Sequence, residues 1–235
     1  MRRKRKVASS LIPILITAAA VTLWVFETYE LVDIPLVEEK RSQQIQAQDP
    51  KAAVTKGKTT RTGKYESYSG CTLATDRSND GDSFRVKLPD GRSEIIRLYF
   101  VDCPESAFKT YGGGRNNHER IAKQAMDLGR ISSPQAVEIG KEAKKFSIFH
   151  LGKAPFTLHT KWDSPFNDKR YHGFIQINFN GKSRFLHELL VEKGYARIHT
   201  KGSQLPDGTS VREQEDHLNK LERAAKSSEA GAWGL

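Results

Sequence analysis

The order of strand and helix signals after Tyr65 restricts the fold of this chain more than any other feature of its sequence. Alternating apolar residues and turn signals predict strands, then helices, then strands and helices again. Strands are expected at 69–75, 83–88, 95–101, 156–162, 171–179, 183–185 and 195–199, and helices at 116–128, 133–150, 186–192 and 211–230. This order is typical of an α+β domain that contains a small β-barrel.

The first residues differ in composition from the rest of the chain. Five basic residues at positions 2–6 precede an uncharged, mostly apolar run of 20 residues at 7–26. About 20 apolar residues span a bilayer as a helix, and basic residues favour its cytoplasmic side. Residues 1–26 therefore predict a single membrane anchor that leaves the rest of the chain outside the cytoplasm. Cleavage after Ala20 is the alternative, and it would release a secreted or periplasmic protein.

Residues 27–64 are polar and poor in aromatic side chains. Such a stretch buries too little apolar surface to offset the entropy lost on ordering, so it predicts a flexible linker before a domain at 65–235. The formal charge of +10 is uneven, because ten bases fall at 2–6 and 51–64. The expected domain is only mildly basic, which fits a polyanionic partner but also an ordinary soluble domain.

The chain has two cysteines, Cys71 and Cys103. Two are too few for a disulfide scaffold or a cysteine-rich zinc site. An exported domain would allow them to pair, and the sequence alone leaves this open.

The first cluster that suggests chemistry is a pair of carboxylates around a glycine, Asp80-Gly81-Asp82-Ser83. Glycine permits a bend that turns both carboxylates toward one pocket, and calcium prefers several oxygen ligands of this kind. Most such triplets are simply turns, so this cluster alone is weak support for a metal site.

The second cluster combines an arginine, two carboxylates and a rigid turn at 97–105. A strand is expected to place Arg97 and Val101 on one face, and Pro104 fixes the turn that projects Glu105. Taken alone, a structural ion pair between Arg97 and either Asp102 or Glu105 is the simpler interpretation.

Together the two clusters resemble the staphylococcal nuclease (thermonuclease) family. Its hallmark is Asp-Gly-Asp-Thr, a hairpin, and then an arginine, four apolar residues and Asp-Thr-Pro-Glu. This chain reads Asp-Gly-Asp-Ser at 80–83 and Arg-Leu-Tyr-Phe-Val-Asp-Cys-Pro-Glu at 97–105, and the likeness continues at 187–197 and 215–222. The resemblance implies an OB-like five-stranded β-barrel with three helices over 65–235.

The resemblance also implies a role for each matching residue. Asp82 and Asp102 would bind Ca²⁺ through their carboxylates, the backbone carbonyl of Cys103 would add a ligand, and Asp80 would lie in the outer shell. The family threonine is replaced here by Cys103, which keeps that carbonyl.

On the substrate side, Glu105 would orient or deprotonate the attacking water, and Arg97 would bind the scissile phosphate. A dianionic transition state needs positive charge, and calcium and a guanidinium group supply it.

One departure concerns the second phosphate-binding arginine of the family. Ungapped counting places His172 there, while Arg170 lies two residues earlier and on the same face of a strand. We favour Arg170, because its permanently charged fork suits a phosphoryl group better than a titrating imidazole. Lys169 and Arg170 are therefore expected to bind substrate.

A second departure is an insertion at 107–133, whose helix carries His118 and Arg120. We expect a packing helix there, with the border of the substrate groove as the alternative. The tyrosines that stack on a base in the family are also missing after Ala196.

The predicted function is a calcium-dependent nuclease that hydrolyses DNA and RNA and leaves 3′-phosphates, acting as a monomer. The alternative is a weak or inactive module of the same fold that binds nucleic acid or a protein partner.

Overall fold

The computed structural model describes residues 57–235. The predicted anchor at 1–26 and most of the predicted linker at 27–64 lie outside these residues and stay predictions. Within residues 57–235, no helix is both long and apolar enough to cross a membrane. The described part has an α+β fold, in agreement with the order of signals in the sequence.

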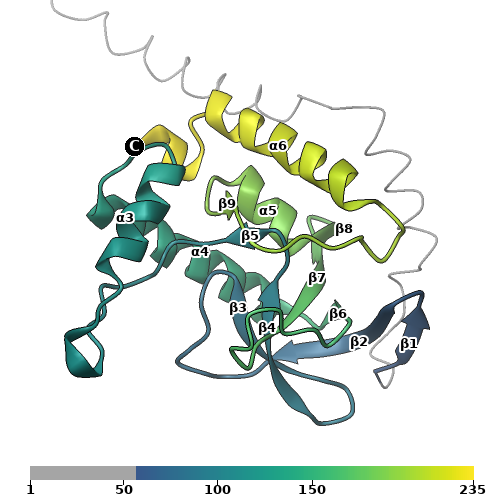
Figure 1. Cartoon of the computed structure of the whole chain (residues 1–235). Helices are drawn as coiled ribbons and strands as arrows, with labels where there is room; N and C mark the ends of the chain where they lie inside the picture. Colours follow the sequence, from purple (N-terminus) through teal and green to yellow (C-terminus); the bar gives the residue numbers. More distant parts are fainter. Residues whose placement is uncertain (1–56) are drawn as a thin grey trace, which may run out of the picture. The chain divides into compact units, whose positions relative to one another are not determined.

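Five strands close into a barrel (Figure 1). In order around the barrel they are β2 (Tyr65–Leu73), β3 (Ser83–Lys87), β4 (Ser93–Leu98), β7 (Tyr171–Phe179) and β6 (Phe156–Thr160). Neighbours are antiparallel except for the parallel pair β4 and β7, and β6 pairs with β2 to complete the ring. The alternation of buried residues along β3, with Phe84 and Val86 fully buried, fills the barrel interior.

Within residues 57–235, four shorter strands lie outside the barrel. β1 (Thr59–Thr62) pairs with β2, and β8 (Lys182–Phe185) pairs with β7. β5 (Val101–Asp102) and β9 (Arg197–Ile198) form a separate two-stranded sheet. Because β1 falls within the predicted linker, the ordered sheet begins earlier than the boundary expected at Tyr65.

The strand expected at 95–101 is interrupted, which corrects the prediction that Arg97 and Val101 share one face. Phe100 has a positive φ of 70°. Its N–H donates to the carbonyl of Lys201, and its carbonyl accepts from the N–H of His199. The chain therefore leaves the barrel after Leu98 and pairs with β9 instead, where Asp102 lies opposite Arg197.

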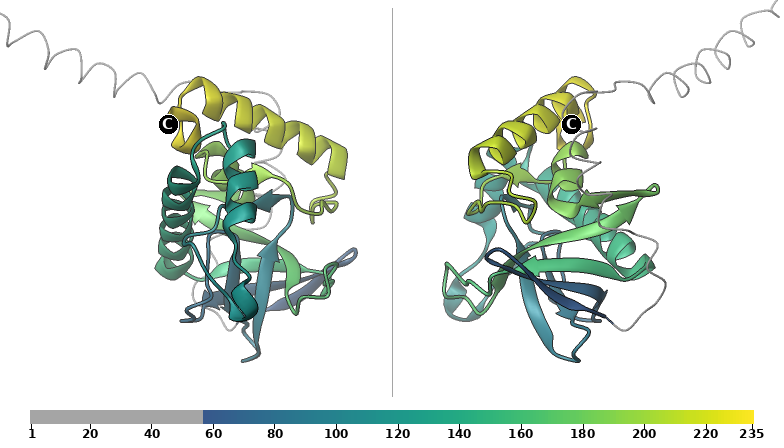
Figure 2. Two further views of the ribbon diagram at one scale, coloured as in Figure 1. Left: turned by 60° about the vertical axis from the view of Figure 1, so that its left-hand side comes forward. Right: turned by 90° about the vertical axis from the view of Figure 1, so that its right-hand side faces the viewer.

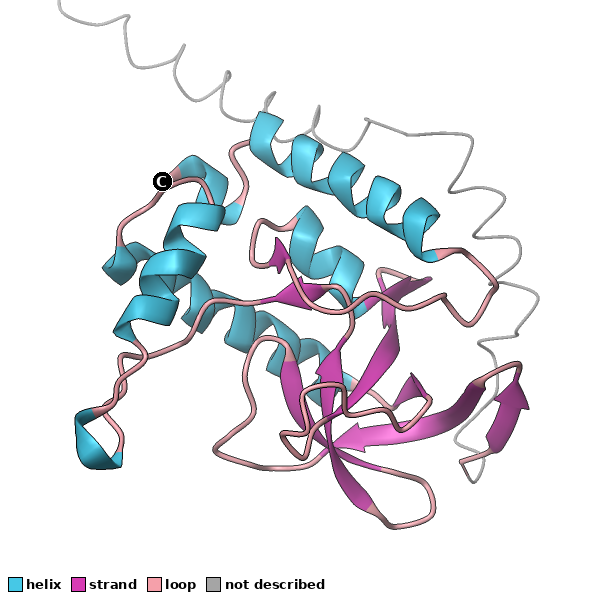
Figure 3. Cartoon of the chain, viewed as in Figure 1, coloured by secondary structure: helices cyan, strands magenta, loops and turns pink. Residues whose placement is uncertain are grey.

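Four α-helices are present in the described part, gathered on one side of the barrel strands (Figures 2 and 3). They are α3 (His118–Asp127), α4 (Ser133–Lys153), α5 (Leu186–Glu192) and α6 (Val211–Ser227). The family pattern implied three, and α3 is the additional helix, formed by the insertion. Its apolar side chains pack with α4 and the short 3₁₀ helix η2 (Gly231–Gly234) in a second apolar cluster.

α4 begins at Ser133, as expected from the sequence, and continues to Lys153, three residues beyond the expected end. Ser132 is the N-cap, its hydroxyl accepts the N–H of Gln135, and the Gln135 side chain reciprocates in a capping box. Pro134 lies in the first turn, where a missing N–H costs nothing. This long, well-capped helix is the support against which the candidate site is built.

Candidate active site

The two carboxylate motifs meet where α4 crosses behind them. A Cβ atom at Gly81 would lie 2.8 Å from Cβ of Cys103 and 2.9 Å from Cβ of Ala143, so only glycine allows this approach. Ser147 on α4 donates its hydroxyl to the carbonyl of Gly81 at 2.8 Å. Gly81 therefore permits close packing against Cys103 and α4 in addition to the bend expected from the sequence.

Gly140 on α4 likewise allows the backbone at 104–105, in the second carboxylate motif, to pack closely against the helix. A Cβ atom there would lie 2.5 Å from the backbone carbonyl oxygens of Pro104 and Glu105. The N–H of Glu105 also donates to Oε1 of Gln124 at 3.1 Å, so α3 and α4 together fix the backbone at this residue.

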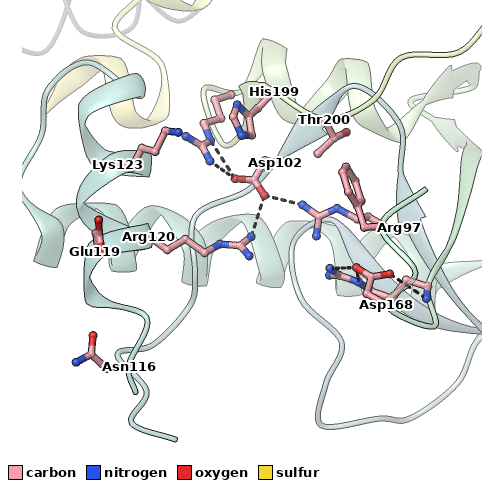
Figure 4. A pocket seen from close by; sticks show the side chains of 12 residues that line it. Arg97, Asp102, Asn116, Glu119, Arg120, Lys123, Asp168, His199 and Thr200 are labelled. Atoms are coloured by element: carbon pink, nitrogen blue, oxygen red, sulfur yellow. Dashed lines mark hydrogen bonds and ion pairs between the residues drawn. The ribbon is translucent and has the colours of Figure 1, made fainter. Parts of the chain in front are cut away.

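Asp102 lies at the centre of a ring of nitrogen donors (Figure 4). Its Oδ1 accepts from Nη2 of Arg97 at 2.6 Å and from Nη2 of Arg120 at 3.0 Å. Its Oδ2 accepts from Gln124 at 2.9 Å and from Nε and Nη2 of Arg197 at 2.9 and 2.8 Å. Three guanidinium groups thus surround one carboxylate, and Asp102 is itself only 2% exposed.

This ring decides the charge of Asp102. Burial by itself raises the pKa of its carboxyl, but Arg120, the Gln124 amide, Arg97 and Arg197 outweigh burial and hold the pKa below its usual value. Burial likewise works against the charge of Arg97, and Asp82 and Asp102 outweigh it, so its pKa is raised. Both groups are therefore ionised at neutral pH.

The remaining carboxylates have fewer partners. Asp82 is 5% exposed and accepts from the N–H of Cys103 and the hydroxyl of Ser83, both at 2.9 Å. Oδ1 of Asp80 is buried and has no hydrogen-bond partner among the described residues. Burial, and then the charges of Asp82 and Glu105, raise the pKa of Asp80 to about 6. Asp82 also lies 3.4 Å from Nη2 of Arg97, so among these carboxylates the uncompensated negative charge is greatest at Asp80, beside the arginine ring.

Glu105 is held between two cations. Nε of Arg120 lies 3.3 Å from one of its carboxylate oxygens, and Nζ of Lys109 lies 3.7 Å from the other. Its side chain is 16% exposed, so solvent reaches it.

A hollow of about 780 Å³ opens in front of Asp102. It is lined by Arg97, Asp102, Asn116, Glu119, Arg120, Lys123, Phe166, Asp168, Arg170, Arg197, His199 and Thr200. Five of these residues are arginines or lysines, and Phe166 is 57% exposed. A concave surface rich in guanidinium groups with an exposed aromatic ring fits a phosphate ester that carries a base.

Comparisons with known proteins identify the family of this chain. Residues 95–234 match the family model of staphylococcal nuclease homologues. This chain belongs to the staphylococcal nuclease homologue family. An uncharacterized protein of Methanocaldococcus jannaschii is 28% identical over 156 residues, which is 66% of this chain and 67% of that protein.

Proteins of this family generally depend on calcium, so the carboxylates of this site can be tested for their fit to a calcium ion. Asp80 and Asp82 fit a hard cation, because they bring together buried carboxylates with an excess of negative charge and one unbonded oxygen. Among residues 57–235, however, no three His, Cys, Asp or Glu side chains form a ready-made metal site.

The other two predicted ligands are engaged by donors. A carboxylate has about four lone-pair sites, and five N–H contacts surround Asp102. The carbonyl of Cys103 accepts from Nε2 of Gln124 at 2.9 Å. At least one donor must leave before Asp102 binds a cation, and Arg120 has the most solvent around it, with 45% of its side chain exposed.

For the second phosphate-binding residue of the family, the two candidates lie in different surroundings. Arg170 lines the hollow and pairs with Asp168, and its Nη1 lies 3.5 Å from the hydroxyl of Ser83. His172 is fully buried, and neither ring nitrogen has a hydrogen-bond partner among the described residues. Burial, and then Arg97, lower the pKa of His172 to about 4, so it is neutral at pH 7. The neighbouring Lys169 is exposed and does not line the hollow.

Sequence reasoning gave no role to Gln124 and Arg197 and placed Arg120 on a packing helix. Arg120, Lys123 and Gln124 have the spacing of one helix face, and this was the available signal. Arg197 lies in a segment that resembles the family, but its contact with Asp102 spans 95 residues of sequence.

The two cysteine thiols are buried and unpaired. Cys71 and Cys103 are both buried and free, so they do not form a disulfide. Burial, and then the neighbouring carboxylates, raise the pKa of the Cys103 thiol well above its usual value, which keeps it protonated and unreactive.

Proposed function

We propose that this protein is a nuclease that hydrolyses the phosphodiester bonds of DNA and RNA with the help of calcium. The observation that carries the proposal is that Arg97 and Arg170 line one hollow beside Asp102, with Glu105 at its border. Two permanent cations and a solvent-accessible carboxylate are the groups that phosphodiester hydrolysis requires.

The arginines bind the scissile phosphate. Their planar forks donate two N–H bonds to phosphate oxygens, and the bonds strengthen as negative charge develops in the transition state. Asp102 holds Arg97 from behind with a 2.6 Å hydrogen bond, so that the guanidinium group is oriented before substrate arrives. His172 is neutral and buried, which supports Arg170 as the second cation.

Glu105 accepts the proton of the attacking water or orients it. Its backbone is fixed by Gly140 and Gln124, and its carboxylate is shared between Arg120 and Lys109. Calcium, held by Asp80 and Asp82 and by Asp102 once a donor has left it, would add positive charge at the phosphate.

The products and the range of substrates follow from the resemblance. The family breaks the bond to the 5′ oxygen and leaves 3′-phosphates, a reaction that needs no 2′-hydroxyl and so applies to DNA and RNA. Phe166, exposed at the hollow, takes the place of the missing tyrosines as the ring on which a base stacks. We further propose that the nuclease domain lies outside the cytoplasm as a monomer, tethered by residues 1–26.

One observation favours the alternative of a weak or inactive binding module. The donors that saturate Asp102 oppose calcium at that residue. An inactive module would still bind a polyanion through its arginines.

The deciding experiment measures cleavage of end-labelled single-stranded DNA and RNA by the full-length chain, with calcium or with a chelator. We expect calcium-dependent cleavage, a kcat about 10²–10⁴-fold lower for Glu105→Gln, and a large loss for Arg97→Ala. Lys220→Ala on α6 is the control. Sensitivity of the products to a 3′-phosphatase identifies their ends. Full activity of Glu105→Gln, or no cleavage at all, would overturn the proposal.

A further inference from the structure

A second basic groove includes Lys109, the residue whose Nζ lies 3.7 Å from Glu105. It has a volume of about 720 Å³ and is lined by Arg77, Ser106, Ala107, Lys109, Lys141, Lys144, Lys145, Ile148 and Phe149. These residues come from the loop after β2, the segment after Glu105 and one face of α4. We call it the α4 groove. None of its residues lines the hollow.

The α4 residues of this groove repeat with helical spacing. Positions 141, 144, 145, 148 and 149 follow the pattern i, i+3, i+4, i+7 and i+8, which places them on one face. The opposite face of the helix is buried through Ala136, Ala143 and Ser147. At about 1.5 Å per residue, the lysines and Phe149 extend over about 12 Å of surface.

The positive charge of the groove is only partly neutralised, and the charge of Lys144 also acts on Asp80. Lys141 pairs with Glu138 at 2.7 Å, and Lys109 lies 3.7 Å from Glu105. No ion pair with a described residue occurs for the other three cations, which are Arg77, Lys144 and Lys145. Beside them Phe149 is 61% exposed, an unusual place for a large apolar ring. Cations next to an exposed aromatic ring match a strand that offers phosphates and bases in turn.

Glu105 connects the two concave surfaces. One of its oxygens faces Arg120, which lines the hollow, and the other faces Lys109, which lines the α4 groove. Glu105 thus contacts one lining residue of each surface, so a strand that leaves the hollow past Glu105 can reach the α4 groove.

We propose that the α4 groove binds the backbone of single-stranded nucleic acid beyond the scissile phosphate, with a base stacked on Phe149. The inference deepens the proposed function and rests on it. Lysines act as point charges and stacking accepts any base, so binding there does not depend on sequence. Continuity with the hollow favours a nucleic-acid strand over an anionic lipid surface, which has no reason to extend to Glu105.

The test is equilibrium binding of labelled oligonucleotides to the full-length chain in chelator, measured by fluorescence anisotropy over a range of salt. A dinucleotide fills the hollow, whereas a dodecanucleotide also reaches the α4 groove. The test variant is Lys144→Gln with Lys145→Gln, and its matched control is Lys220→Gln with Arg223→Gln, which removes the same charge from exposed positions on α6. Phe149→Ala tests stacking separately.

We expect the advantage of the dodecanucleotide over the dinucleotide to shrink in the test variant. The slope of log K against log salt should fall by about 1.4, since each phosphate contact contributes about 0.7 for single strands. Phe149→Ala should weaken dodecanucleotide binding roughly 5- to 150-fold. The α6 control should bind as the wild type does.

Equal dodecanucleotide affinity of the test variant and the control would overturn the inference. It would also fail if vesicles of phosphatidylserine, and not the dodecanucleotide, lost binding in the test variant. The proposed function is tested by a separate measurement, because binding in chelator does not require hydrolysis. A chain that cleaves but binds independently of α4 refutes only the inference, and a chain that binds through α4 without cleaving refutes only the nuclease.

Discussion

The hollow and the α4 groove are both basic, but they hold their cations in opposite ways. In the hollow, Arg97 and Arg197 are each 5% exposed and are fixed to Asp102 by short hydrogen bonds. On α4, Lys145 is exposed and has no ion pair with a described residue. Buried guanidinium groups on a shared carboxylate have one geometry, whereas exposed lysines keep their rotamer freedom and adapt.

The difference indicates what each surface is suited to do. In the proposed function, transition-state stabilisation requires donors that are oriented before charge develops, and the ring around Asp102 would hold Arg97 in this way. Holding a strand whose bases vary requires charge without fixed geometry. The two surfaces should also differ in how much stability a substitution removes. Removing one member of a buried ion cluster lowers the free energy of unfolding strongly, whereas removing an exposed lysine does not.

The largest effect should come from breaking the ring. Asp102→Ala leaves Arg97 and Arg197 buried without their main counter-charge, so we expect the free energy of unfolding to fall by about 3–5 kcal/mol. Urea denaturation followed by circular dichroism measures it. Asp127→Ala is the control, because it removes the outer partner of Arg197. The Asp127 side chain is 44% exposed, so the free energy of unfolding should fall by below about 1 kcal/mol. Similar values for both variants would contradict a special role of the ring.

The sequence predicted the elements that depend on local signals. β7 and α5 have the expected bounds, because the signals that end them lie close by in the sequence: Asn180 and Gly181 follow β7, and Gly194 follows α5, all three with positive φ. The carboxylate motifs also meet, as a match in two separated places implied.

The features that were missed depend on distant parts of the chain. The break at Phe100 is set by hydrogen bonds to residues 199 and 201. The ring around Asp102 joins β4, β5, α3 and β9, and no local pattern at Arg197 indicates it. Partners this far apart in sequence are brought together by packing, so helix spacing can suggest that Arg120 and Gln124 share a face but does not identify Asp102 as their partner.

The next effect distinguishes the two candidate cations. Arg170→Ala removes a fork from the hollow and should lower kcat/KM about 10²–10³-fold. His172→Phe keeps a buried ring and removes only a neutral imidazole, so its kcat/KM should stay close to the wild-type value. Initial rates on a labelled oligonucleotide at pH 7 compare the two. A mild Arg170→Ala phenotype beside a severe His172→Phe loss would reverse the assignment.

A smaller effect concerns the excess carboxylate charge. Asp80 has a pKa of about 6 in the folded chain against an ordinary 3.8, so the folded state binds its proton more tightly than the unfolded state does. Its contribution to stability is present below pH 3.8 and is lost as the pH rises through 6. In chelator, Asp80→Asn should therefore raise the free energy of unfolding by about 2–3 kcal/mol above pH 6.

The gain of Asp80→Asn should disappear toward pH 3.8, and the exposed Asp216→Asn on α6 should show neither change. Urea denaturation at several pH values measures both. A constant difference at every pH would mean that the variant acts through packing and not through charge.

The smallest effect should be found on α4. Lys141→Gln breaks the ion pair with Glu138, but both side chains are more than half exposed, at 53% and 66%. Water and salt already screen this pair, so the free energy of unfolding should change by below about 0.5 kcal/mol. Urea denaturation beside Asp102→Ala makes the contrast direct. A loss above about 1 kcal/mol would mean that the α4 groove is a rigid ion network like the hollow, and adaptable binding of a strand would lose its physical basis.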